Sequence, residues 1–278
     1  MDRLANYTYI FILIFLFILE GRSDDHIRIL IALSLSFLIS MYAFLVNWIT
    51  LDGVFAATVF GTVALGLGGW ILAGLVLVFF VSSSLVTRHR DQSGKITSLG
   101  IFAEGTKERR NGLQIWANGF WIALFAVIWF LFRDESLLVM ASAALATATA
   151  DTWATELGSR KKGHTVLITN FRKVDPGTDG AISLKGTLAG FWGALLIAFA
   201  FFIFSRNTDL EIISIVALSG FLGCIADSYL GAIYQHNNPD SNHWFNRYFN
   251  SHDYANNAVN WIATGLGALF ALFLIQLT

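Results

Sequence analysis

The sequence predicts an all-α fold, a polytopic bundle of transmembrane helices that forms one integral-membrane domain over residues 1–278. Hydrophobic residues make up 55% of the chain and charged residues only 13%, whereas soluble proteins carry about 25% charged residues. Several stretches run for about twenty residues with few charges, which is the length needed to cross a bilayer. The polar segments between them leave no room for a sizeable soluble domain. We expect residues 52–278 to form the core, with the helices of residues 1–51 peripheral to it.

Apolar runs separated by polar or glycine-rich breaks predict nine membrane spans. Their expected ranges are 7–20, 27–51, 54–67, 69–87, 113–132, 137–158, 187–204, 211–235 and 257–277. Only Gly66, Gly68 and Gly69 interrupt residues 54–87, so we expect this stretch to cross twice in two short, tilted or re-entrant halves. The first run follows Arg3 as in a signal peptide, but no small-x-small cleavage site follows it, which favours a retained helix.

The distribution of basic residues predicts the orientation of the bundle. Three polar loops, residues 88–112, 159–186 and 236–256, hold thirteen of the 18 Lys and Arg residues. Cytoplasmic segments of membrane proteins carry an excess of Lys and Arg. We therefore expect these loops and the amino terminus on the cytoplasmic side and the carboxyl terminus outside. In a prokaryote the membrane would be the plasma membrane.

Two carboxylates lie near the end of the expected helix 137–158, in the stretch Ala146-Thr-Ala-Thr-Ala-Asp151-Thr-Trp-Ala-Thr-Glu156-Leu-Gly158. An Asp at the centre of a membrane helix costs about 2.5 kcal/mol or more, so it usually faces a polar cavity or a partner. The alternative is that Asp151 and Glu156 are interfacial. A similar stretch, Ala226-Asp227-Ser-Tyr-Leu-Gly231, follows 76 residues later. The repetition favours a functional site.

These acidic residues predict a Mg²⁺ site at the cytoplasmic side of the bundle. Mg²⁺ prefers oxygen ligands and usually keeps water and substrate phosphates. We expect Asp151 and Asp227, on neighbouring helices, to bind it, with Glu156 as a third ligand or an outer group. The alternative is that each Asp belongs to a polar network between helices. Three hydroxyl residues beside the carboxylates are expected to bind substrate or nucleotide: Thr152, Thr155 and Ser228.

Asparagines gather at the cytoplasmic starts of two expected helices. Gln114 and Asn118 lie four residues apart in one of them, and Asn256, Asn257 and Asn260 occupy the equivalent place in the last. Helix starts offer unpaired N–H groups and a positive dipole end to anions. We expect Asn118, Asn257 and Asn260 to bind substrate phosphates. Helix capping and hydrogen bonds between helices are the alternative.

The basic, glycine-rich loop 159–186 is the best candidate for a phosphate-binding segment. It contains Arg160-Lys161-Lys162 and then Pro176-Gly-Thr-Asp-Gly180-Ala-Ile-Ser183-Leu-Lys185-Gly186, although it lacks the Walker A ending. Glycines let backbone N–H groups approach an anion closely. The residues expected to bind phosphate are Gly177, Thr178, Gly180, Ser183 and Lys185, with Lys185 catalytic. The alternative is a surface loop on anionic lipid headgroups.

Other residues carry less of the predicted chemistry. Arg110, in a second basic segment with Lys107, is expected to add to the phosphate site. The single cysteine, Cys224, predicts neither a disulfide framework nor thiol catalysis. A net charge of −1 without a basic stripe gives no reason to expect nucleic-acid binding. Three histidines lack zinc-site spacing and are expected to be loop residues: His236, His243 and His252.

Five sequence blocks occur in a recognisable order: Asn118-Gly119, Ala150-Asp-Thr-Trp-Ala-Thr-Glu156, Gly177-Thr-Asp-Gly-Ala-Ile-Ser183, Ala226-Asp-Ser-Tyr-Leu-Gly-Ala232 with Gln235, and Asn257-Ala-Val-Asn260. Together they resemble a widespread integral-membrane family over roughly residues 40–277. That family includes plant phytyl-phosphate kinase and animal transmembrane protein 19, and it is distantly similar to dolichol kinase and CDP-diacylglycerol synthase. The resemblance implies transfer of a phosphoryl group from a nucleoside triphosphate, CTP or ATP, to an isoprenoid monophosphate at the cytoplasmic face.

The residues are compatible with that chemistry. Phosphoryl transfer depends mainly on positioning and charge neutralisation. An acceptor phosphate monoester is already ionised at neutral pH, so no strong general base is needed. Three other functions stay open: nucleotidyl transfer that makes a CDP-lipid, ion-coupled transport or lipid scrambling through the intramembrane carboxylates, and lipid binding or assembly without catalysis. The gathering of polar groups at one membrane face favours an enzyme. The sequence leaves the nucleotide, the prenyl chain and the oligomeric state open.

Overall fold

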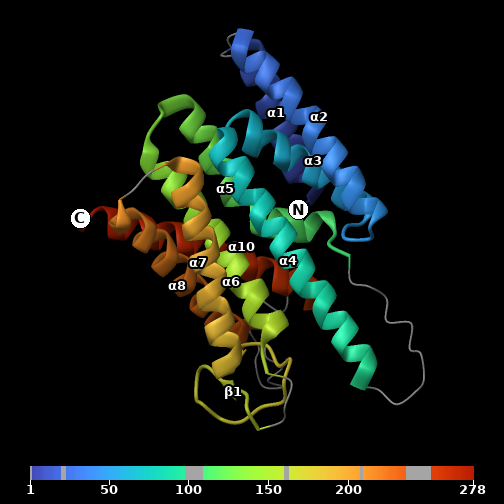
Figure 1. Cartoon of the computed structure of the whole chain (residues 1–278), viewed down its shortest axis with the longest axis vertical. Coiled ribbons are helices and arrows are strands. Elements are labelled where there is room, and N and C mark those ends of the chain that lie inside the picture. The colour runs from blue at the N-terminus through green and yellow to red at the C-terminus, as the bar shows by residue number, and fades with distance from the viewer. Residues whose placement is uncertain (1, 20–22, 98–108, 160–162, 207–208, 236–251) are drawn as a thin grey trace. The chain divides into compact units, whose positions relative to one another are not determined.

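The computed structural model describes residues 2–19, 23–97, 109–159, 163–206, 209–235 and 252–278. The chain divides into two compact units, Met1–Ala141 (unit 1) and Ser142–Thr278 (unit 2). Apart from one short β-hairpin, the regular structure of the described residues is helical (Figure 1). The predicted all-α class is therefore confirmed. A single domain with residues 1–51 peripheral to a core of 52–278 stays a prediction.

Unit 1 contains the first five helices of the described chain and the start of the next. Their bounds are α1 (Asp2–Leu19), α2 (Ser23–Leu45), α3 (Leu51–Gly66), α4 (Gly69–Thr97), α5 (Gly112–Phe132) and α6 (Glu135–Leu157), of which the part from Ser142 belongs to unit 2. The short helix α3 packs against α1, α2, α4 and α5. Tyr9 of α1 stacks on Trp116 of α5, with the ring centroids 4.8 Å apart. These contacts give unit 1 its own core.

Side-chain caps determine where two helices of unit 1 begin. Thr50 caps α3, and Asn111 caps α5 in a capping box with Gln114. Asp52 joins the two helix starts, because its Oδ2 accepts a hydrogen bond from the Gly112 amide at 2.8 Å. The first turn of α5 is thus built for helix capping, which is the alternative that the asparagine cluster left open.

Unit 2 consists of the rest of α6, a β-hairpin and three further helices. Their bounds are β1 (Val166–Leu167), β2 (Ala181–Ile182), α7 (Leu184–Ser205), α8 (Leu210–Tyr234) and α10 (His252–Ile275). The two strands are antiparallel, with Val166 opposite Ile182 and Leu167 opposite Ala181. α8 packs against α7, α10 and β2, so it is central to unit 2 (Figure 1).

Eight helices of the described residues are long and apolar enough to cross a membrane: α1, α2, α4, α5, α6, α7, α8 and α10. The remaining helix, α3, has 16 residues, which corresponds to about 24 Å of helix. That length is shorter than the hydrocarbon core of about 30 Å. The described residues therefore follow the predicted order of nine apolar helices, with α3 as the short first half of residues 54–87. The expectation that both halves are short is wrong for the second, because Gly69–His89 of α4 is a 21-residue candidate span.

Several helix ends differ from prediction, among them the starts of α1 and α10 and the ends of α2 and α4. α2 ends at Leu45 instead of residue 51, because Asn47 has a positive φ of 62° and the chain turns there. α4 continues ten residues past the predicted end, to Thr97. Hydropathy marks the apolar part of a helix, whereas polar residues without proline can extend it. His252, predicted in a loop, is the first residue of α10.

Part of the predicted loop chemistry falls outside the described residues. The basic residues concerned are Lys107 and Arg160 to Lys162, and the histidines are His236 and His243. The described part of loop 159–186 contains the β1–β2 hairpin, which was not predicted from the sequence. Two residues per strand are too few for an alternating hydrophobic pattern to be recognised.

Candidate functional site

The carboxylates of Asp151 in α6 and Asp227 in α8 come together in unit 2. They are hydrogen-bonded to each other, and both side chains are half-buried. Two carboxylates in hydrogen-bonding contact would repel each other if both were ionised. Either one carboxyl carries a proton that it donates to the other, or a cation lies between them. Glu156 is close enough to Asp151, and Asp179 to Asp227, for a repulsive charge interaction.

Glycines on α8 allow this approach of the two helices. A Cβ on Gly220 would overlap Ala146 of α6, and a Cβ on Gly223 would overlap Thr147. Both glycines precede Asp227 on α8, just as Ala146 and Thr147 precede the carboxylate of α6, so the two helices run parallel at backbone contact. Small residues at helix contacts are typical of membrane proteins, because they let backbones pack closely.

Helix α7 closes another side of the pair. A Cβ on Gly190 would lie 3.2 Å from the carbonyl oxygen of Ala150 and 3.4 Å from Cys224 Sγ. Because Ala150 belongs to α6 and Cys224 to α8, one glycine of α7 lies against both carboxylate-bearing helices. Cys224 is buried in this contact, so it packs between the helices.

The turn that precedes β2 is held on the end of α8. The Ala181 amide donates to the Thr178 carbonyl at 3.0 Å, which closes a β-turn with Asp179 and Gly180 at its centre. Gly180 has a φ of +72°, and a Cβ there would overlap the backbone nitrogen and Cα of Ala232. Only glycine fits both requirements. The turn therefore lies directly on α8 and holds Asp179 near Asp227.

Asp179 belongs to the site, although only its neighbours Thr178 and Gly180 were predicted site residues. The sequence feature that could have indicated its position is the Asp-Gly dipeptide, which is typical of tight turns. Thr178 is engaged within the turn, because its hydroxyl donates to the Asp175 carbonyl at 2.7 Å. Gly177 has a φ of +90° and is exposed, with nothing close to a side chain added there.

Ser183 and Lys185 take different positions at the start of α7. Ser183 caps the helix, and its Oγ accepts hydrogen bonds from the amides of Gly186 and Ser159, each at 3.1 Å. It therefore ties the end of α6 to the start of α7. Lys185 is exposed in the first turn of α7, so its long side chain is accessible to a ligand at this end of the unit.

The predicted hydroxyl residues differ in accessibility. Thr152 donates its hydroxyl proton to the Ala148 carbonyl of its own helix at 2.9 Å, which leaves the oxygen as an acceptor. Thr155 is exposed, and Ser228 is half-buried next to Asp227. Thr152 and Ser228 are thus each adjacent in the chain to one carboxylate of the pair.

Asn260 of α10 lies on the helix face that packs against α6. A Cβ on Gly267 would overlap Thr147 Oγ1, and Asn260 lies seven residues earlier, about two turns away on the same face. Ala255 and Val259 pack with Leu230 and Tyr234 of α8, so α10 runs antiparallel to α8. Asn260 is therefore at the level of the carboxylate end of α6. Asn257, one turn earlier, is buried.

Two predicted site residues belong to unit 1. Arg110 exchanges backbone hydrogen bonds with Trp48 and Thr50, each at 3.0 Å, and its guanidinium lies over the Phe79 ring, 5.3 Å from the centroid. These contacts give Arg110 a packing role. Asn118 is half-buried, and its Nδ2 donates to the Gln114 carbonyl at 3.2 Å. The other predicted site residues belong to unit 2.

The carboxylate pair would suit Mg²⁺ that binds together with a phosphate substrate. Among the described residues, no group of three or more His, Cys, Asp or Glu side chains is arranged to hold a metal ion. Mg²⁺ does not need such a cage, because it is commonly bound by one or two carboxylates with substrate phosphates and water. Asp151 and Asp227 would supply those oxygens. The place of Glu156 as a third ligand stays a prediction.

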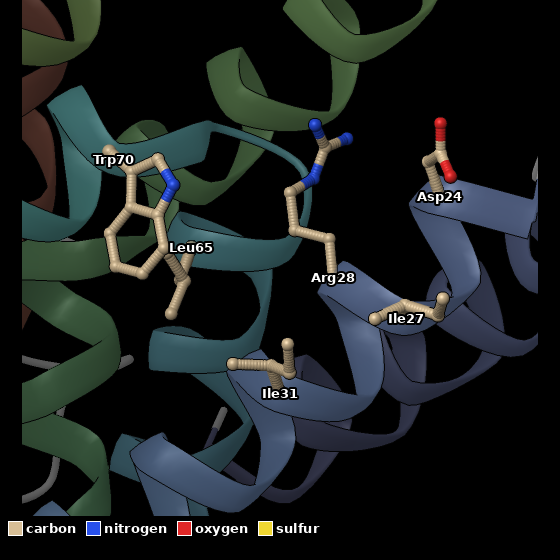
Figure 2. Close-up of a pocket in the computed structure, with 6 residues that line it drawn as sticks. All are labelled: Asp24, Ile27, Arg28, Ile31, Leu65 and Trp70. Atoms are coloured by element: carbon tan, nitrogen blue, oxygen red, sulfur yellow. The ribbon is translucent and has the colours of Figure 1, made fainter.

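A cavity of about 380 Å³ lies in unit 1, away from every predicted site residue of that unit. Its lining residues are Asp24, Ile27, Arg28, Ile31, Leu65 and Trp70, and Figure 2 shows the Arg28 side chain between Trp70 and Asp24. Arg28 donates to the Gly66 carbonyl at 2.9 Å and to Asp25 Oδ1 at 2.8 Å. Arg28 thus joins α2 to the end of α3.

Comparison with known proteins identifies relatives that are membrane proteins. The family described as integral membrane protein DUF92 matches residues 34–268. An uncharacterised membrane protein of Methanocaldococcus jannaschii is 33% identical over 185 residues, which cover 66% of this chain and 74% of that protein. An uncharacterised membrane protein of Synechocystis sp. is 30% identical over 233 residues, or 78% of each chain.

A plant relative is found as well. The chloroplastic protein VTE6 of Arabidopsis thaliana is 26% identical over 238 residues, which cover 84% of this chain and 67% of that protein. No solved structure matches the chain. The relatives therefore come from an archaeon, a cyanobacterium and a plant.

Proposed function

The chain belongs to the DUF92 family of integral membrane proteins, and from this membership we propose that it transfers a phosphoryl group from a nucleoside triphosphate to an isoprenoid monophosphate. The Asp151–Asp227 pair carries the proposal, because two carboxylates in contact within a membrane bundle are costly unless they bind a ligand. The resemblance to the family that includes plant phytyl-phosphate kinase supports the isoprenoid acceptor. CTP or ATP is the proposed donor.

In the proposed reaction an oxygen of the acceptor phosphate attacks the γ-phosphorus of the nucleotide. A P–O bond forms to the acceptor, the bond between the γ-phosphorus and the β–γ bridging oxygen breaks, and the nucleoside diphosphate leaves with the electron pair. Phosphate monoesters are largely ionised at neutral pH, so no side chain has to remove a proton.

The described residues have separate tasks in this scheme. Asp151 and Asp227 would hold Mg²⁺, which neutralises phosphate charge when bound. The Asp179–Gly180 turn, fixed on α8, would bring backbone donors to the phosphates. Lys185 is accessible at the start of α7 and would neutralise the transferred group. Asn257 and Asn260 would orient the substrate from α10.

The position of the reaction in the membrane is part of the proposal. The carboxylate pair lies in the last part of α6 and of α8, and the β1–β2 hairpin covers the same end of α8. A lipid phosphate has its head at the membrane surface and its tail among apolar helices, so both parts of such a substrate would find a matching environment. The positive-inside rule favours the cytoplasmic face for this end.

An activity screen tests the proposal. Purified protein in liposomes is combined with prenyl monophosphates of several chain lengths, Mg²⁺ and each of CTP, ATP, UTP and GTP, and the products are resolved by mass. We expect a prenyl diphosphate together with the nucleoside diphosphate. A nucleotide–lipid conjugate with released pyrophosphate would instead identify a nucleotidyltransferase. Ion flux across the liposomes without turnover would favour a transporter.

A further inference from the structure

One face of α8 extends from Asp227 through Gly231 to Gln235, because residues four apart share a helix face. The backbone N–H of Gln235 donates to the Gly231 carbonyl at 3.0 Å, and the residue keeps helical backbone angles. The Gln235 side chain therefore begins about two turns beyond Asp227, on the same side of α8 as the carboxylate.

The turn that carries Asp179 covers the same face. A Cβ on Gly231 would lie 3.2 Å from the backbone nitrogen of Gly180 and 3.2 Å from Gln235 Oε1. The Gln235 side-chain amide and the Gly180 backbone thus both lie against Gly231, which brings them close together because it has no side chain. Asp179, the neighbour of Gly180, interacts electrostatically with Asp227, so the turn and Gln235 lie at the same end of α8 as the carboxylate pair.

The Gln235 side chain is enclosed, yet its donor is unused. The residue is only 9% exposed, and Nε2 has no hydrogen-bond partner within the part of the chain that the structure describes. A buried donor without a partner costs stability, and native proteins contain few of them. An acceptor that entered from the substrate side would satisfy it.

We propose that Gln235 Nε2 donates a hydrogen bond to a phosphate oxygen of a substrate bound beside Asp151 and Asp227. This inference rests on the proposed function, because it needs a phosphate at the carboxylate pair. A neutral donor suits the place: Asp151, Asp227 and Asp179 repel a phosphate, whereas an amide attracts its oxygen at any pH. The phosphate belongs either to the nucleotide or to the lipid monophosphate.

Binding measurements on three variants test the inference. Equilibrium dialysis in detergent with Mg²⁺ measures two probes separately, a non-hydrolysable nucleoside triphosphate analogue and a prenyl monophosphate. Gln235→Leu removes the donor, and Gln235→Glu keeps the shape but replaces the donor by a carboxylate oxygen. Gln276→Leu is the matched control, because Gln276 is exposed at the end of α10.

We expect Gln235→Leu to lower the affinity for one of the two probes about tenfold, which corresponds to the loss of one hydrogen bond to a charged group. Gln235→Glu should weaken the same probe further, and Gln276→Leu should bind like the wild type. The affected probe identifies the source of the phosphate. Wild-type affinity of Gln235→Glu for both probes would overturn the inference, as would an equal loss of both probes with a lower unfolding temperature of the ligand-free protein.

The same measurement separates this inference from the proposed function. If the wild type binds a probe through Gln235 but forms no prenyl diphosphate, the phosphate site stands and the kinase activity fails. If the wild type forms prenyl diphosphate and Gln235→Glu keeps its kcat and KM, the activity stands and the role of Gln235 fails. If the wild type binds neither probe, both fail.

Discussion

Asp151 and Asp227 are hydrogen-bonded to each other although they belong to different helices and lie 76 residues apart in the sequence. The contact depends on Gly220 and Gly223, which bring the backbone of α8 onto α6. Two acidic side chains at one helix contact require a proton or a cation between them. The pair is therefore the feature of unit 2 that most strongly indicates a functional site.

Replacing either carboxylate by its amide tests that function. Asp151→Asn and Asp227→Asn keep the size of the side chain and remove the charge that would hold Mg²⁺. We expect each to abolish Mg²⁺-dependent turnover, a loss of at least about a hundredfold, because phosphoryl transfer relies on charge neutralisation. Membrane insertion and the unfolding temperature should stay close to wild type. Full activity in both variants would contradict the assignment.

The turn on α8 makes a separate prediction. Gly180→Ala and Gly177→Ala both place a side chain at a positive φ, but only residue 180 faces the backbone of Ala232. We expect Gly180→Ala to lower activity strongly and to raise proteolysis between residues 163 and 182, because the turn can no longer lie on α8. Gly177→Ala should cost only the backbone strain, roughly 1 kcal/mol. Equal behaviour of the two variants would show that the contact with α8 is unimportant.

Close packing around Thr147 predicts a coupled pair of substitutions. A Cβ on Gly223 would overlap Thr147 Oγ1, so Gly223→Ala should lower the free energy of unfolding by about 1–3 kcal/mol through overpacking. Thr147→Ala removes the overlapping atoms. The double variant should therefore be more stable than the sum of the single effects predicts, measured as a double-mutant cycle in detergent. Additive effects would mean that the two helices separate more easily than the structure indicates.

The membrane orientation can be measured with single cysteines in a Cys224→Ser background. Arg88→Cys is at an exposed position in the C-terminal part of α4. Lys173→Cys is at an exposed position in the loop of the β-hairpin. Both should react with a membrane-impermeant thiol reagent from the same side of sealed vesicles. Asp134→Cys, exposed between α5 and α6, should react only from the other side. Labelling of the first two from opposite sides would refute the predicted topology.

The sequence predicted the helices well because membrane spans are long apolar runs that read clearly without tertiary information. It missed the extension of α4 to Thr97 because polar helical residues do not differ in hydropathy from a loop. Helix ends set by a single residue, such as the left-handed Asn47 after α2, also escape a hydropathy pattern.

The candidate site could be predicted only in part. The repeated Ala-Asp motif indicated Asp151 and Asp227, because an acidic residue in an apolar helix is unusual in itself. Asp179 and Gln235 are less conspicuous, since acidic and amide residues are common in loops and at helix ends, although both occur in the blocks that carry the family resemblance. Their place depends on the contact of Gly180 with Ala232 and on the close approach of Gly180 and Gln235 at Gly231, which only the folded chain reveals.

Phosphoryl transfer to the lipid is tested most directly by following the γ-phosphate of the nucleotide into the product. Purified protein is incubated with a prenyl monophosphate, Mg²⁺ and nucleoside triphosphate labelled either at the γ- or at the α-phosphorus, beside the Asp227→Asn variant. We expect the γ-label alone to enter the lipid, as a prenyl diphosphate, and the variant to transfer none. Entry of the α-label, or γ-label transfer that persists in Asp227→Asn, would contradict this expectation.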